Sequence, residues 1–124
     1  MYMIEIQDQF TGAHAVVLPS GEREPSHTHC WQIRLFLTRK ELDQHNMVID
    51  FHAVQTLLKE ILSPLQGCDL NRNESLGPSP TAELVARFIF DRLTKKLAAI
   101  APDVRVKSLG VSEAQNCWAW YTRC

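Results

Sequence analysis

Alternating apolar and polar residues predict β-strands in four parts of the chain, because successive side chains of an extended backbone point to opposite faces. The four stretches are about residues 2–17, residues 27–38, a segment that begins after Pro102, and residues 117–123. In the third stretch the alternation changes phase between Val106 and Leu109, which indicates a bulge or two short strands. The polar segment 18–26 connects the first two stretches, so we expect a long hairpin with a wide loop.

Apolar residues at helical spacing predict two helices in the middle of the chain. The first is expected to have Asp50 as its N-cap and to end at Pro64, which cannot continue a helix. The second is expected to have Ser79 as its N-cap, Pro80 at the first helical position and its last turn near Ala99. The apolar stripes are Val54, Leu57, Leu58, Ile61 and Leu62 in the first helix, and Leu84, Val85, Phe88, Ile89, Leu93 and Leu97 in the second.

The order of elements is therefore β-β-α-α-β-β, which is typical of an α+β fold. We expect an antiparallel four-stranded sheet with both helices on one face. A length of 124 residues indicates one domain that spans residues 1–124. An open sheet leaves unpaired strand edges, and oligomerisation is one way to cover them.

Composition narrows the class of partner. The formal net charge of −1 predicts neither a nucleic-acid partner nor a membrane surface. No apolar run approaches the roughly 20 residues that a membrane helix needs, and the N-terminal segment lacks the pattern of a signal peptide. We therefore expect a cytoplasmic protein.

The cysteines are Cys30, Cys68, Cys117 and Cys124, and they show no C-x-x-C spacing. Without a secretion signal, disulfides are not expected. We predict scattered thiols, some of them buried, with Cys124 exposed at the end of the chain.

Two histidines one residue apart, His27 and His29, begin the second alternating stretch. In a strand they point to the same face, and hairpin pairing would bring His14 opposite them. Three neutral imidazoles without a fourth protein ligand are typical of an open zinc site, where water or substrate completes the tetrahedron. The alternative is a group of solvated or core histidines. Cys30 is expected to point to the opposite face and is not counted as a ligand.

Six short motifs occur in order along nearly the whole chain. They are FTGAH (10–14), HTH (27–29), MVIDF (47–51), LN (70–71), PTAE (80–83) and EAQNCWAWY (113–121). Together they resemble the 6-pyruvoyl-tetrahydropterin synthase family, which includes the bacterial 6-carboxy-tetrahydropterin synthases of queuosine biosynthesis. The resemblance implies the tunnelling fold, with the element order given above. It also implies a homo-oligomer, with trimers that stack into hexamers and sites at the subunit interfaces.

By the same resemblance, the zinc ligands of the family match His14, His27 and His29. Glu113 matches the glutamate that anchors the pterin. A carboxylate can accept two parallel hydrogen bonds from the amino and ring N–H groups of a pterin. A competing alignment places Ser108 at the anchor position, but it breaks the spacing to the aromatic residues that follow.

Thr81 and Glu83 match family positions near the pterin pocket of an adjoining subunit. The alternative explanation is the chemistry of a helix N-terminus, where a hydroxyl caps the first turn and a carboxylate faces the helix dipole. The sequence leaves both explanations open.

The chain departs from the family pattern shortly before the H-x-H pair. Most members carry a catalytic cysteine four residues before the pair, where this chain has Arg23. Glu24 lies three residues before His27, and the resulting E-x-x-H-x-H is similar to a subgroup in which glutamate replaces the cysteine. That subgroup cleaves the side chain of dihydroneopterin triphosphate to give 6-hydroxymethyl-dihydropterin, a folate precursor. The resemblance implies that Glu24 is the catalytic base, and the alternative is an ordinary loop glutamate.

A second departure concerns an Asp-His pair that forms a proton relay before the L-N motif in the family. Gln66 and Gly67 stand at these positions, and neither can transfer a proton near neutral pH. The candidates to replace the pair are Cys68, Asp69, His45 and His52. Loop packing and turn formation are the simpler explanation for the first two. Thr28 stands where the family usually has glycine, which leaves metal ligation possible.

The sequence supports three functional hypotheses. The first is a zinc-dependent lyase that acts on 7,8-dihydroneopterin triphosphate or a related dihydropterin. The second is a homologue that binds zinc and a pterin without turnover. The third is a structural oligomer in which zinc only ties the hairpin together, and it does not explain the spacing of Glu113 to the following aromatic residues. We favour the lyase.

Overall fold

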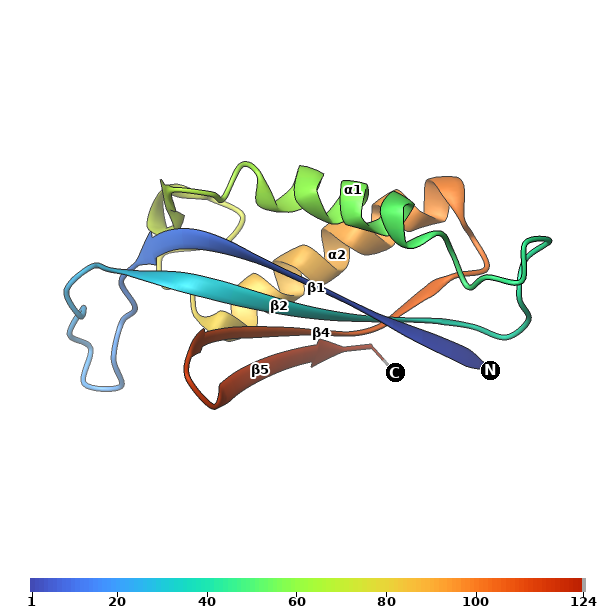
Figure 1. Ribbon diagram of the computed structural model, residues 1–124. Coiled ribbons are helices and arrows are strands. Elements are labelled where there is room, and N and C mark those ends of the chain that lie inside the picture. Colours follow the sequence, from blue (N-terminus) through green and yellow to red (C-terminus); the bar gives the residue numbers. More distant parts are fainter. Residues whose placement is uncertain (124) are drawn as a thin grey trace.

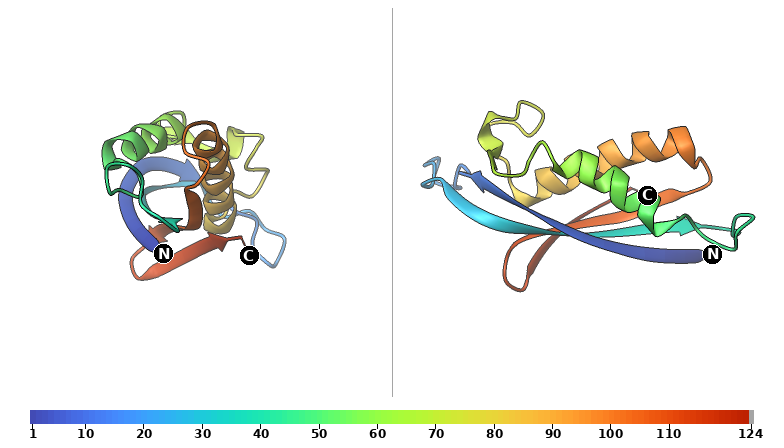
Figure 2. Two further views of the ribbon diagram at one scale, coloured as in Figure 1. Left: turned by 90° about the vertical axis from the view of Figure 1, so that its right-hand side faces the viewer. Right: turned by 45° about the horizontal axis from the view of Figure 1, so that its top comes forward.

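The computed structural model describes residues 1–123, and Cys124, expected to be exposed, lies outside them. The elements in chain order are β1 (Tyr2–His14), β2 (His27–Arg39), α1 (Phe51–Leu62), β3 (Cys68–Asp69), the 3₁₀ helix η1 (Leu70–Arg72), α2 (Ala82–Ile100), β4 (Arg105–Ala114) and β5 (Cys117–Thr122). Both helices pack on the same side of the sheet (Figures 1 and 2). The predicted α+β class is confirmed. No helix within residues 1–123 is long and apolar enough to cross a membrane.

The sheet has five strands in the order β3-β1-β2-β4-β5, and not the four that the sequence predicts. The additional strand, β3, pairs in parallel with the end of β1 through two residues only. Two residues are too few to show an alternating pattern, so the sequence could not predict this strand. It forms because the segment pairs with the end of β1. The other neighbouring strands pair antiparallel, as expected.

The first strand ends at His14 and not near Val17 as predicted. Beyond His14 the backbone N–H groups bond to side chains in place of β2. The N–H of Ala15 donates to Asn71 at 2.8 Å, that of Val16 to Glu24 at 3.2 Å, and that of Val17 to Ser79 at 2.9 Å. The wide loop predicted between the first two strands follows from these bonds.

The cap of α2 also differs from the prediction. Thr81 is the N-cap, because its hydroxyl accepts a hydrogen bond from the N–H of Leu84 at 3.3 Å. Ser79 is not the cap, because its hydroxyl accepts from Val17. Pro80 therefore precedes the helix. The predicted N-cap of α1 is confirmed, since Asp50 accepts from the N–H of His52.

The core lies between the sheet and the two helices. Trp31, Leu35 and Leu58 have no exposed surface, and neither does Leu93 of α2. The predicted irregularity in β4 is a bulge, because Phe36 pairs with Ser108 while the next residue of β2 pairs with Val106.

The other face of the sheet carries no helix in the described chain. Trp118 and Trp120 stack there, and the guanidinium of Arg34 lies within 5.8 Å of both ring centres. Trp120 covers Gly110, where a Cβ atom would lie 2.7 Å from its ring.

The three described cysteines are free and exposed, so the expectation that some thiols are buried is wrong for them. Cys30 occupies the polar side of β2, as predicted.

Candidate metal centre

Three histidines extend the helix-facing side of the β1–β2 hairpin beyond its apolar residues. His14 ends β1 on this side, and His27 and His29 precede the buried Trp31 on the same side of β2. Strand pairing places His14 opposite His27, and Gly12 opposite His29. One potential ligand atom from each ring lies within 4.8 Å of the others. The group lies at the end of the sheet from which loop 15–26 projects (Figure 1).

His14 is fully buried and its ring is fixed by two contacts. Its Nδ1 lies 2.8 Å from the carbonyl oxygen of Pro80. The ring of Trp31 packs against it at 4.8 Å between centres. A carbonyl oxygen can only accept, so Nδ1 carries the hydrogen, and in the neutral ring Nε2 presents a lone pair.

The same reasoning applies to His27, whose Nδ1 lies 3.0 Å from the carbonyl oxygen of Pro25. Its Nε2 lies 3.1 Å from Nε2 of His14. Two lone pairs therefore face each other across 3.1 Å when both rings are neutral, and a cation between them removes the repulsion. Fixing a ligating imidazole through its other nitrogen is the usual arrangement in metal sites. Two donors on one tetrahedral zinc ion lie about 3.3 Å apart, so the residues fit a metal ion.

Burial lowers the pKa of His29 below its ordinary value near 6.5. The carboxylate of Glu113 opposes this effect, the nearby rings of His27 and His14 add to it, and Glu24 opposes it. The lowered pKa favours the neutral ring at neutral pH. A neutral imidazole is the form that binds metal ions.

Two carboxylates flank the three rings. Oε1 of Glu24 accepts a hydrogen bond from the N–H of Val16 at 3.2 Å and lies 3.6 Å from Nε2 of His27. Oε2 of Glu113 lies 3.0 Å from Nε2 of His14. The structure thus brings together five of the seven residues that the sequence singled out. The arrangement offers three nitrogen ligands with an acidic group on either side.

A family model described as 6-pyruvoyl tetrahydropterin synthase matches residues 3–124. The chain belongs to this family. None of the curated protein sequences compared with the chain gives a significant match.

Solved structures of 6-pyruvoyl tetrahydropterin synthases share the fold. The Caenorhabditis elegans protein is 18% identical with a TM-score of 0.80, over 99% of this chain and 96% of that chain. The Plasmodium falciparum protein is 14% identical with a TM-score of 0.80, over 98% and 97%. A catalytic residue mutant of the Plasmodium vivax protein, in which alanine replaces a glutamate, is 15% identical with a TM-score of 0.76, over 99% of each chain. The expected tunnelling fold is confirmed.

Arg23, which stands where most 6-pyruvoyl tetrahydropterin synthases are expected to have cysteine, is part of a structural clamp. Its Nη1 donates to the carbonyl oxygens of Ala15 at 3.2 Å and Pro78 at 2.9 Å. The guanidinium is therefore directed into the segment before α2. The adjacent Glu24, and not Arg23, faces the histidines.

Sequence reasoning missed the role of Asn71, although the L-N motif contributed to the family resemblance. Its side chain accepts from the N–H of Ala15 and donates to the carbonyl oxygens of Ala15 and Pro78. It thus ties the end of β1 to the segment that bears the Pro80 carbonyl group. The sequence could not predict these contacts, because all three partners are backbone atoms, which every residue carries. The L-N motif was the one signal that marked the position.

The residues proposed to replace the proton relay fall into two groups. Cys68 and Asp69 pair with Gly12 and Ala13 of β1, so they lie beside the histidine end of the sheet. Both are exposed, and Asp69 caps η1 by accepting from Asn71. His45 and His52 lie around the connection between β2 and α1, at the opposite end of the molecule (Figure 1).

Thr81 and Glu83 occupy the first turn of α2 and do not contact the three rings within the chain. The hydroxyl of Thr81 caps the helix, and Glu83 is exposed. The contact from this segment to the metal centre is the carbonyl oxygen of Pro80. Ser108, the competing anchor, pairs with Phe36 in the other half of β2.

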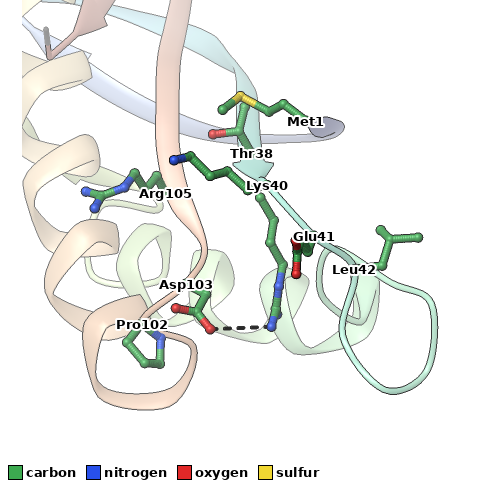
Figure 3. A pocket seen from close by; sticks show the side chains of 9 residues that line it. Met1, Thr38, Lys40, Glu41, Leu42, Pro102, Asp103 and Arg105 are labelled. Atoms are coloured by element: carbon green, nitrogen blue, oxygen red, sulfur yellow. Dashed lines mark ion pairs between the residues drawn. The ribbon is translucent and has the colours of Figure 1, made fainter.

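A half-open cavity of about 480 Å³ lies at the other end of the sheet (Figure 3). It is lined by Met1, Thr38, Arg39, Lys40, Glu41, Leu42, Pro102, Asp103 and Arg105. Arg39 and Asp103 form an ion pair of 3.6 Å across it. No histidine lines this cavity, so it is separate from the candidate metal centre.

Proposed function

We propose that the chain is a zinc-dependent lyase acting on 7,8-dihydroneopterin triphosphate or a related dihydropterin, with Glu24 as the base. The product we propose is 6-hydroxymethyl-dihydropterin. The observation that supports this best is the convergence of three imidazoles beside the carboxylate of Glu24, whose Oε1 lies 3.6 Å from Nε2 of His27. A bound metal can polarise a substrate oxygen, and a carboxylate held next to it can then remove a proton.

His14, His27 and His29 would hold the zinc ion through neutral rings. When bound, zinc would polarise a side-chain oxygen of the dihydropterin and make its hydroxyl proton more acidic. The burial of His14 and the Pro80 carbonyl group would keep the first ring from turning away. Family membership supports the zinc assignment as well.

Glu24 would accept the proton from the hydroxyl group on the second carbon of the substrate side chain while the bond between the first and second carbons breaks. It would then return the proton to the first carbon, and the two-carbon aldehyde that carries the triphosphate would leave. The N–H of Val16 holds one of its oxygens in place, so the carboxylate is oriented before substrate arrives. The P. vivax relative gives independent support, because its catalytic residue mutant replaces a glutamate. A glutamate base would also explain why Arg23 can occupy the cysteine position without loss of the reaction.

Glu113 would hold the pterin ring through paired hydrogen bonds to its amino and ring N–H groups. Thr81 and Glu83 would contribute to a pocket across a subunit boundary in a homo-oligomer, a trimer or a hexamer. The hydroxyl of Thr81 caps α2 and Glu83 is exposed, so a role in substrate binding would be directed toward a neighbouring copy.

A second candidate function is a zinc- and pterin-binding protein without turnover. The observation that favours it lies at the expected relay positions. Gln66 uses its side-chain oxygen to accept from the N–H of Thr11, and Gly67 has no side chain. Neither residue can pass a proton, so turnover would depend on Glu24 alone or on a group from another subunit.

The decisive experiment is to incubate the zinc-loaded protein with 7,8-dihydroneopterin triphosphate and to separate the pterin products by chromatography with fluorescence detection. We expect a 6-hydroxymethyl product that is lost in Glu24→Gln and retained in Glu22→Gln, a charge-matched change on the exposed loop. A 6-pyruvoyl or 6-carboxy product would preserve the lyase but require a different base. Substrate that binds and returns unchanged would favour the binding protein.

A further inference from the structure

A carboxylate oxygen beside the three histidines is a fourth potential metal ligand, and it lacks a hydrogen-bond partner among the described residues. Oε2 of Glu113 is buried and receives no hydrogen bond from residues 1–123, although the side chain as a whole is 29% exposed. Nε2 of His14 lies 3.0 Å from this oxygen. A buried carboxylate oxygen without a partner costs free energy, so this contact requires an explanation.

The contact is not an ordinary hydrogen bond from a neutral ring. The hydrogen of neutral His14 is on Nδ1, where it is donated to the carbonyl oxygen of Pro80. Nε2 then presents a lone pair to Oε2 of Glu113 and another to Nε2 of His27. Three electron-rich atoms surround one small space, and a positive charge placed there would satisfy all of them.

The other nearby carboxylate is arranged differently. Oε1 of Glu24 already accepts from the N–H of Val16, and it lies farther from the nearest ring nitrogen, at 3.6 Å from His27. The 3.0 Å and 3.1 Å separations of Glu113 and His27 from His14 are close to the spacing of about 3.3 Å between neighbouring donors on tetrahedral zinc. Glu113 is therefore the better placed fourth donor.

We propose that Glu113 is the fourth metal ligand of the substrate-free protein, so that the centre is closed at rest and opens when substrate displaces this carboxylate. The proposal rests on the zinc site of the proposed function. In the substrate-free protein Glu113 would bind the metal, and it would bind the pterin ring only after substrate has arrived. Its partly exposed side chain, at the end of β4, can rotate away from the metal and become available to the pterin ring.

The test uses Co²⁺ as a visible probe in the full chain after removal of bound metal. We expect wild-type protein to give the intense visible absorption of four-coordinate cobalt, and we expect added azide to leave this spectrum unchanged. In Glu113→Gln, cobalt affinity should fall at least about tenfold, and azide should change the spectrum because water now occupies the fourth position. Glu22→Gln, which removes the same charge from the exposed loop, should behave as wild type.

Three results would overturn the inference while leaving the metal site intact. They are equal azide sensitivity in wild type and Glu113→Gln, an unchanged cobalt affinity in Glu113→Gln, or these changes appearing in Glu24→Gln in place of Glu113→Gln. Failure of wild-type protein to bind cobalt or zinc would instead overturn the proposed zinc site itself. Glu113→Asp is the second variant, because it keeps the charge on a shorter side chain. Its cobalt affinity should lie between those of wild type and Glu113→Gln, and circular dichroism checks that each variant is folded.

Discussion

The position of His14 depends on backbone groups that lie far from it in the sequence. Its Nδ1 donates to Pro80, 66 residues away, and the segment that bears this carbonyl group is held to Ala15 by Asn71 and Arg23. The orientation of one ring of the candidate metal centre is therefore set by a clamp built from two polar side chains. Disturbing the clamp should loosen the ring without touching it.

Replacing Asn71 with Ala should destabilise the protein by about 1–3 kcal/mol, because the N–H of Ala15 loses its acceptor. The carbonyl groups of Ala15 and Pro78 each lose one donor and keep Arg23. Asn71→Asp keeps the acceptor for the N–H of Ala15 but turns a second acceptor oxygen toward the two carbonyl groups, so it should be less stable than wild type as well. Urea denaturation measures the free energy of unfolding. Gln44→Ala, at an exposed turn, serves as the control and should stay within about 0.5 kcal/mol of wild type. An unchanged stability in Asn71→Ala would show that water replaces the clamp.

At the scale of elements, the sequence correctly predicted the features that depend on neighbouring residues in the chain. The alternation in residues 27–38 placed Trp31 and the two preceding histidines on the correct face, and the phase change near Val106 marked the bulge. The cap Asp50 was also visible, because it bonds within its own turn.

The features that the sequence did not predict depend on contacts between distant segments. The strand β3 exists because it lies beside the end of β1. Ser79 resembles an N-cap but bonds to Val17 across the fold, which leaves Thr81 to cap the helix. The contact of Glu113 with His14 joins strands that are not neighbours in the sheet, and no local pattern reports such a contact.

The corrected cap gives a direct prediction for α2. Thr81→Ala should lower the free energy of unfolding by about 1 kcal/mol, because the N–H of Leu84 loses its acceptor, whereas Thr81→Ser should retain most of the stability. Chemical denaturation of the two variants measures the difference. If Thr81→Ala instead keeps full stability but weakens pterin binding, the cap would be unimportant and the role in a substrate pocket would gain support.

At the scale of the whole molecule, metal binding should be linked to folding. His14 is buried in the folded state, and its partners His27 and His29 come from a different strand, so the unfolded chain has no assembled site. With free zinc at 100 times the dissociation constant, the folded state should gain about 2.7 kcal/mol, or roughly 10 °C in melting temperature. Differential scanning fluorimetry with zinc and with a chelator measures this shift.

The variant His27→Ala tests whether the shift comes from the proposed site. It should bind no zinc and show no zinc-dependent rise in melting temperature. His45→Ala should keep both, because His45 belongs to the connection between β2 and α1, which lies at the other end of the molecule from loop 15–26 (Figure 1). Undiminished zinc content in His27→Ala, measured by mass spectrometry of the metal, would contradict the assignment of the three histidines.

The open edges of the sheet bear on the size of the assembly. Within residues 1–123, β5 forms one edge along its whole length, and β3 covers only Gly12 and Ala13 of β1 at the other. Two long free edges on one chain can pair head to tail with further copies and close into a ring. We expect light scattering after size-exclusion chromatography to give a mass that is a multiple of three chains. A monomer would contradict both the oligomer and a pocket shared between subunits.

Glu24 lies on a loop, and loops and strands differ in how readily they accept mutations during evolution. The three histidine rings belong to two strands with matched register, whereas Glu24 belongs to the connecting loop, whose tip closes on itself through Leu18, Gly21 and Glu22. Loops accept insertions and substitutions at little cost in stability. If the proposed function holds, mutation in this loop can alter the reaction while the three histidines that would bind the metal stay in place. For an engineer, residues 18–22 and Glu24 are the positions to randomise when a new chemistry is sought on the same three histidines, while Arg23 is kept because it holds the segment before α2.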